Sequence, residues 1–133
     1  MPNLNTNNQQ IKIKTMNTYH FLSIGLVAII HSYIMHIEMV LWTTEKGIKI
    51  FGLKSKQFAE ETKVLAANQG LYNGFLAVGL FWSVLLKNKE IALFFLSCVL
   101  IAGIYGAFST KKIKIFYIQS IPAIIAILIC VFL

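Results

Sequence analysis

A carboxyl group and three imidazoles lie within one long apolar stretch near the start of the chain, and side chains of these types carry out acid–base chemistry. At about 100° per helical residue, His20, His31 and Glu38 share one stripe. Trp42 continues that stripe, whereas His36 points away from it. Because ionisable groups inside a membrane span are costly and are functional candidates by default, we assign Glu38 and His31 as the candidate catalytic residues. Glu38 would exchange a proton, and His31 would tune or relay it.

A second group of polar side chains lies in the next apolar stretch, where four hydrogen-bonding residues fall within six positions. They are Asn68, Gln69, Tyr72 and Asn73. At about 1.5 Å per residue, they lie at the depth of Glu38 and toward the same end of the helices. Interhelical hydrogen bonds would account for one or two of them, whereas four favour a polar ligand or ordered water. The predicted ligand-binding set is completed by Trp42, Tyr105 and Gln119, which fall in the same half.

Several other kinds of site are excluded by residue types and spacing. The three histidines share one helix, and the i+5 spacing of His31 and His36 splits their directions, so one subunit cannot ligate a haem with two histidines. Cys98 and Cys130 lack CxxC spacing, and no Gly-rich phosphate loop, serine nucleophile motif or zinc signature occurs. We therefore expect no metal and no cofactor. All twelve basic residues are Lys, so bidentate Arg recognition of nucleic acid is impossible and no nucleic-acid partner is expected.

The elements that must position these residues are membrane helices. The chain has 133 residues, of which 57% are hydrophobic and 13% charged, a balance too apolar for a soluble domain of this size. We predict an all-α integral membrane four-helix bundle with both termini on the same side. Its spans are 18–42, 64–86, 91–108 and 113–133, preceded by a polar, disordered leader over residues 1–17. Ser55 is the expected N-cap of one helix that runs from 56 to 86.

The lysines predict the orientation of the bundle. The loop 43–63 and the third connection carry eight lysines, and the opposite side carries four. The positive-inside rule places these Lys-rich loops in the cytoplasm and both termini outside. The half nearest the termini is almost wholly apolar, so we expect a cavity that opens to one side only. Gly70 and Gly74 have GxxxG spacing for close helix contact, either within one subunit or in a homodimer.

Several strings resemble a small bacterial integral membrane family called domain of unknown function 1304. They are HSYIMHIEMVLW at 31–42, FAEETK at 58–63, ANQGLYNG at 67–74, AGIYGA at 102–107 and QSIPA at 119–123. The resemblance covers about 16–133 and implies a compact four-span inner-membrane protein. It implies no activity.

Three functions stay open. The leading hypothesis is a polar pocket that binds a small amphipathic or lipid-like molecule, with chemical alteration of that molecule as an extension of the same role. The first alternative is a proton-coupled exporter that works as a dimer, and the second is a structural or partner-binding membrane protein whose polar cluster only locks helix packing. Membrane lipids are expected partners under all three.

Overall fold

The computed structural model describes residues 15–133, and these residues form four helical rods joined by short connections. The rods are α1 (Thr18–His36) continued by η1 (Ile37–Leu41); α3 (Lys56–Leu85); α4 (Lys89–Thr110); and α5 (Ile113–Ile115) continued by η2 (Phe116–Ser120) and α6 (Ile121–Phe132). A short helix, α2 (Glu45–Phe51), lies in the first connection. No strand occurs in the described part of the chain, so the all-α prediction is confirmed.

Short polar side chains begin the helices. The side chain of Asn17 accepts from the backbone N–H groups of Tyr19 and His20 at the start of α1. Ser55 Oγ accepts from the Phe58 N–H at 3.0 Å, so the predicted N-cap of α3 is confirmed. Asn88 does the same for α4 through the N–H of Ile91. These bonds satisfy donors that a helix start leaves without a partner, and they fix where each rod begins.

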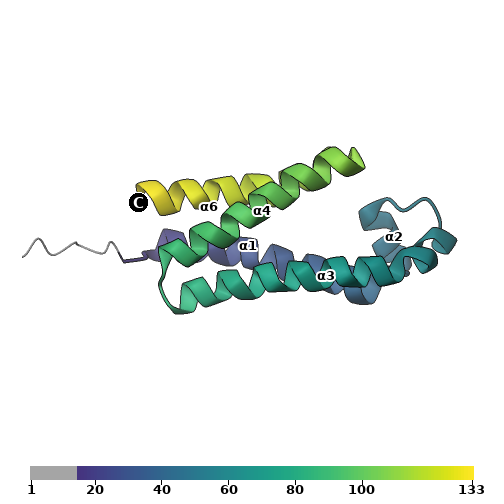
Figure 1. Ribbon diagram of the computed structural model, residues 1–133, viewed down its shortest axis with the longest axis horizontal. Coiled ribbons are helices and arrows are strands. Elements are labelled where there is room, and N and C mark those ends of the chain that lie inside the picture. Colours follow the sequence, from purple (N-terminus) through teal and green to yellow (C-terminus); the bar gives the residue numbers. More distant parts are fainter. Residues whose placement is uncertain (1–14) are drawn as a thin grey trace, which may run out of the picture.

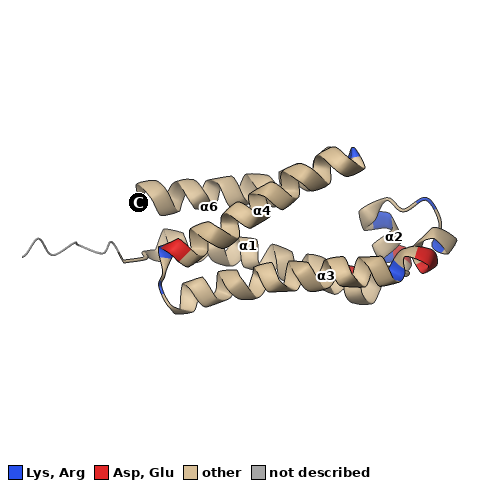
Figure 2. Ribbon diagram, in the orientation of Figure 1, with Lys and Arg blue, Asp and Glu red and all other residues tan. Residues whose placement is uncertain are grey.

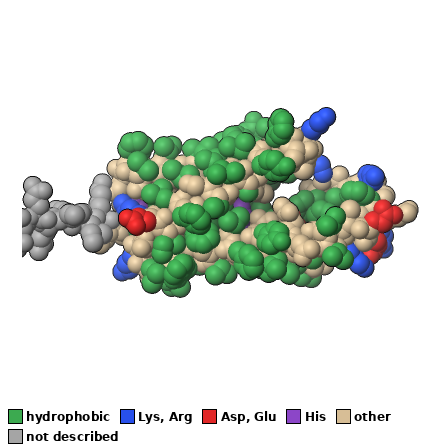
Figure 3. Space-filling view, viewed as in Figure 1, with side chains coloured by type: hydrophobic (Ala, Val, Ile, Leu, Met, Phe, Trp, Pro, Cys, Tyr) green, Lys and Arg blue, Asp and Glu red, His purple; other side chains and the backbone are tan. Residues whose placement is uncertain are grey.

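All four rods are long and apolar enough to cross a membrane. The spans are Thr18–Leu41, Lys56–Leu85, Lys89–Thr110 and Ile113–Phe132. Charged residues gather at the two ends of the bundle, and the ribbon between them is almost free of charge (Figure 2). Apolar side chains cover the length of the visible face (Figure 3), as expected for a surface that faces lipid. The prediction of four long apolar helices is therefore confirmed, and their ends differ from the predicted ends.

The four rods pack as two antiparallel pairs. α1 lies along α3, and α4 crosses over this pair beside α6 (Figure 1). The start of α1 and the end of α6 lie at the same end of the bundle (Figure 1). At the opposite end, the surface is notched between the tip of α4 and the α2 region (Figure 3), and Lys112 Nζ donates to the Phe51 carbonyl across the two connections.

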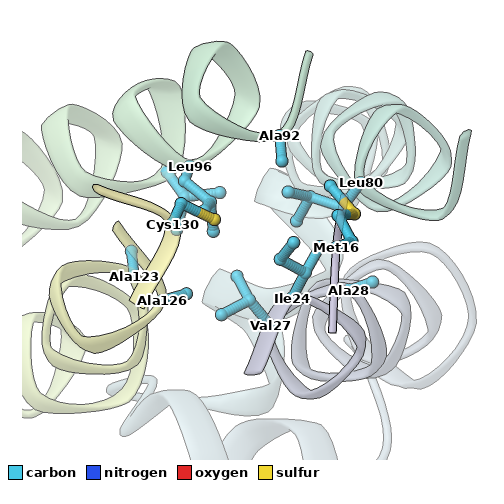
Figure 4. Packing of buried hydrophobic residues seen from close by; sticks show 11 residues of the cluster. Met16, Ile24, Val27, Ala28, Leu80, Ala92, Leu96, Ala123, Ala126 and Cys130 are labelled. Carbon is cyan, nitrogen blue, oxygen red and sulfur yellow. The ribbon is translucent and has the colours of Figure 1, made fainter. Parts of the chain in front are cut away.

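The main core fills the half of the bundle nearest the termini, which we call the apolar half. Ile24, Val27, Leu80 and Leu96 are its largest fully buried side chains and meet at the centre of the four rods (Figure 4). Met16 also belongs to this core and is 6% exposed. Met16 and the capping Asn17 are thus parts of the bundle, although the sequence placed both in the leader. The rest of that expected leader, up to residue 14, lies outside the described residues.

Candidate functional site

A π-helical segment positions Glu38. α1 ends at His36, and the chain continues as η1 over Ile37–Leu41, where the hydrogen bonds span one residue more than in an α-helix. π-helical turns of this kind are frequent at functional sites. Glu38 lies in this turn with only 7% of its surface exposed.

Glu38 and Asn73 form the central polar contact of the site. Asn73 Nδ2 donates to Glu38 Oε2 at 2.8 Å and to the Gln69 carbonyl at 3.2 Å. The first bond joins η1 to α3, and the second holds the amide against its own helix. Asn73 is 8% exposed, so both partners of this contact are buried. The predicted proximity of the two polar groups is confirmed for this pair.

Two glycines allow the close approach of α3 and α1 that this bond requires. A Cβ at Gly70 would lie 2.6 Å from Met39 Cγ and 3.0 Å from Glu38 Cβ, and one at Gly74 would lie 2.7 Å from Met35 Sδ. Of the two alternatives for the Gly70/Gly74 face, the structure shows contact within one chain. A homodimer through this face stays a prediction.

A cavity of about 310 Å³ opens beside Glu38. It lies between the end of the first rod and the first turns of the second span. Its lining residues are Glu38, Met39, Val40, Trp42, Thr43, Lys63, Val64, Ala67 and Asn68. A carboxyl, an amide, an indole and an ammonium group thus meet in one mostly apolar hollow.

Contacts outside the cavity hold two of its lining residues in place. Trp42 Nε1 donates to Thr62 Oγ1 at 3.0 Å, and the indole packs on the Phe51 ring with 4.9 Å between centroids. Lys63 Nζ lies 3.1 Å from Glu60 Oε2, so its charge is paired on the solvent side. Among the described residues Glu38 forms no ion pair, and it accepts a hydrogen bond from the neutral Asn73 amide.

The imidazoles have separate environments. His31 is fully buried, and its Nδ1 lies 3.0 Å from the Val27 carbonyl. Because a carbonyl only accepts, Nδ1 carries the proton, which leaves Nε2 buried without a hydrogen-bond partner. His31 does not line the cavity. His20 is buried in the capping box of α1, a structural role, and His36 is exposed.

The remaining predicted binding residues are not brought to the cavity. Tyr72 and Tyr105 lie on the outer surface, with 60% and 70% of their areas exposed. Gln69 is also exposed, and Gln119 is half-buried in η2. The structure therefore brings together Glu38, Asn73, Asn68 and Trp42, and leaves the other polar side chains outside this group.

One buried polar residue was missed by the sequence analysis. Ser120 ends the second π-helical segment, is fully buried, and donates from Oγ to the Leu100 carbonyl at 3.2 Å. A Cβ at Gly103 would lie 2.3 Å from this oxygen, so the glycine makes room for the serine. The signal in the sequence was Gly103, a small residue on the neighbouring span that leaves room for another side chain.

The chain is similar to a known protein family and to a curated relative. A family model described as "Protein of unknown function (DUF1304)" matches residues 25–131, a range that includes every residue of the site. A relative from Lactococcus lactis subsp. lactis (strain IL1403), "Uncharacterized protein YpaA", is 27% identical over 106 residues, which are 77% of this chain and 88% of that protein. No solved structure matches the chain.

Proposed function

The chain belongs to the DUF1304 family, and on this premise we propose that it binds a small amphipathic or lipid-like molecule in the cavity beside Glu38. The observation that carries the proposal is a carboxyl that is 7% exposed and lines a hollow of about 310 Å³. A carboxyl that only locked two helices together would need no open space beside it. Ligand sites combine a mostly apolar wall with a few polar groups that orient the ligand, as this cavity does.

The chemical extension of this role is proton exchange. Glu38 has one oxygen held by Asn73, and its other oxygen is available to a ligand in the cavity. The sequence predicts that His31 would tune or relay this proton, but His31 does not line the cavity and its Nε2 is buried without a hydrogen-bond partner. Binding and proton exchange in the cavity would therefore both depend on Glu38.

The apolar half argues against the exporter alternative. Its polar side chains bond within their own helices: Ser83 donates to the Leu80 carbonyl and Ser97 to the Leu93 carbonyl. An alternating-access carrier needs polar groups along a route to both faces. We therefore favour a site that is reached from one face of the membrane.

That face is proposed to be the cytoplasmic face of a bacterial inner membrane. The bacterial relative fits this location, and the lysine bias predicts the orientation. Single cysteines at Lys54→Cys and Lys87→Cys, in a background with Cys98→Ala and Cys130→Ala, test it. An impermeant maleimide added to intact spheroplasts should label Lys87→Cys and spare Lys54→Cys. The reverse pattern would contradict the orientation.

Native mass spectrometry in lipid nanodiscs tests the binding function itself. We expect the wild type to retain a specific small molecule or lipid that the Glu38→Gln variant loses, because Gln keeps the size and removes the charge. Tyr105→Phe is the matched control, since this side chain is 70% exposed and lies outside the cavity. Equal spectra for the wild type and Glu38→Gln would favour a purely structural polar cluster.

A further inference from the structure

We infer that the ligand of the Glu38 cavity carries an organic ammonium group, which lies between the Glu38 carboxylate and the Trp42 indole. The inference rests on the proposed function and names the class of molecule that would bind. It follows from the unmatched charge of Glu38, from the position of Trp42 and from the size and lining of the hollow.

The first step is the charge of Glu38. A buried carboxyl takes up a proton unless a cation or several hydrogen bonds offset the desolvation of its ionised form. Here one oxygen accepts a single bond from a neutral amide, and no ion pair with Glu38 occurs in residues 15–133. The open cavity lies against the same carboxyl. A ligand cation placed there would supply the missing charge.

The second step is the aromatic wall. Ammonium groups are attracted to the faces of aromatic rings, most strongly to that of Trp. Two lysines at the Lys-rich end of the bundle lie over other aromatic rings. Lys46 Nζ lies 5.5 Å from the Tyr33 ring centroid, and Lys54 Nζ lies 4.5 Å from the Phe58 ring centroid. No Lys in the described range is placed over Trp42, which is held by Thr62 and Phe51 as it lines the cavity.

The lysine-rich loops oppose a cation only weakly. Lys63 is the lysine that lines the cavity, and its charge is neutralised by Glu60 at 3.1 Å. The other loop lysines are exposed, and exposed charges are screened beyond about 8 Å at physiological ionic strength. Salt weakens the interactions of the Glu38 carboxyl much less, because this side chain is buried. The buried Glu38 carboxyl therefore favours a cation, which would hold this carboxyl in its ionised form.

The volume of the cavity and the residues that line it limit the size and shape of the ligand. At about 310 Å³, the cavity lies at the small end of ligand sites. Met39, Val40, Val64 and Ala67 give it an apolar wall away from the carboxyl. An ammonium group with a compact apolar substituent matches both parts of this wall. The same ammonium chemistry is available from a soluble amphipathic amine or from an aminophospholipid headgroup.

The test measures binding of benzyltrimethylammonium to the full chain in phosphatidylglycerol nanodiscs by isothermal titration calorimetry. The matched neutral probe is 2-methyl-1-phenylpropan-2-ol, which has nearly the same shape and no charge. We expect Glu38→Gln to weaken binding of the ammonium by about tenfold or more, as loss of a buried charge partner does. Trp42→Leu should weaken it about 2- to 30-fold, the range of a cation–π contact. Tyr72→Leu, a change on the outer surface, should leave it unchanged.

Three results would overturn the inference: equal affinity for the neutral alcohol, ammonium binding that survives Glu38→Gln, or no ammonium binding to the wild type. If the native mass spectrum still shows a Glu38-dependent ligand in any of these cases, the proposed function stands and only the ligand class falls. If that ligand is absent as well, both fall.

Nanodiscs with phosphatidylethanolamine distinguish the two sources of the ammonium group. If the lipid headgroup is the natural ligand, this lipid should lower the apparent affinity for benzyltrimethylammonium and remain bound to the wild type but not to Glu38→Gln. An unchanged affinity supports a soluble amine as the natural ligand.

Discussion

The helices of the two halves of the bundle pack against one another in different ways. In the apolar half, regular α-helices meet through Ile24, Leu80 and Leu96, and the serines bond to their own helices. The other half, which we call the polar half, contains both π-helical segments and the 310 Å³ cavity. Its buried polar groups, Glu38 and Ser120, bond to neighbouring helices. One half is close-packed, and the other leaves space beside a carboxyl.

Because of this difference, we expect the stability of the protein and its ligand binding to depend on different halves of the bundle. Lipid is as apolar as the core, so helices in a membrane associate through close packing and interhelical hydrogen bonds rather than through a hydrophobic driving force. We expect substitutions in the apolar half to change stability most, and substitutions around Glu38 to change binding with smaller costs in stability.

The largest effect is expected from Leu80→Ala. Leu80 is fully buried in the apolar half, and removing its side chain leaves a cavity that costs about 2–5 kcal/mol of unfolding free energy. SDS-induced unfolding in mixed micelles, followed by circular dichroism, measures it. Leu85→Ala is the matched control, because Leu85 lies on the same helix with 79% of its area exposed and should change little. Equal losses would mean that the apolar half is not the packed core.

A smaller loss is expected from Gly70→Leu, which tests the close approach in the polar half. The new Cβ would meet Glu38 Cβ at 3.0 Å and the Met35 carbonyl at 3.1 Å, so the helices must separate, at a cost of about 1–3 kcal/mol. The same unfolding assay applies, and ligand retention should fall as well. At Gly25 nothing lies within 4 Å of an added Cβ, so Gly25→Leu should be tolerated. Tolerance at both positions would contradict the α1–α3 contact.

A double-mutant cycle measures the Glu38–Asn73 bond. Glu38→Ala and Asn73→Ala should show a coupling of about 0.6 kcal/mol, and at most about 1.7, the range for hydrogen bonds between membrane helices. Strictly additive losses would show that this bond adds no stability.

The smallest effect is expected from Ser120→Ala. Its Oγ bonds across to the Leu100 carbonyl, so its loss should cost about 0.6 kcal/mol. Ser83→Ala in the apolar half is the control, since Ser83 bonds within its own helix and joins no two rods. We expect Ser83→Ala to have the smaller effect in the same unfolding assay. A larger loss of unfolding free energy for Ser83→Ala than for Ser120→Ala would contradict the proposed difference between the two halves.

The sequence predicts the spans because hydropathy and length suffice for that. It also predicts the buried stripe of the first helix, since His20, His31 and Glu38 are all buried. Ala123, Ala126 and Cys130 are buried on the fourth rod.

The sequence predicts the second and third spans less well. Of the four polar residues predicted to bind a ligand on the second span, Asn73 is buried and Tyr72 is exposed, whereas the buried face of α3 includes Gly70 and Gly74, which the sequence predicts for close helix contact. Polarity separates inside from outside only where water surrounds a protein, whereas in lipid small residues mark the contact. Tyr105 is exposed for the same reason.

The two π-helical segments could not be read from periodicity, because a helical wheel assumes a constant turn per residue. The first segment, Ile37–Leu41, contains Glu38 of the site, and the second, Phe116–Ser120, contains the buried Ser120. Pro122 lies just after the second segment, in the first turn of α6.

The π-helical turn of η1 lets the first rod hold one residue more than a regular helix of the same length. A π-helical turn covers about the same rotation as an α-helical turn, so a deletion of one residue within Ile37–Leu41 would restore regular helix and leave the direction of Trp42 nearly unchanged. The residues inside the turn would shift instead, among them Glu38, which accepts from Asn73 on α3. Relatives with a one-residue gap in this segment are therefore expected to keep the packing on either side of it and to lose the Glu38–Asn73 contact.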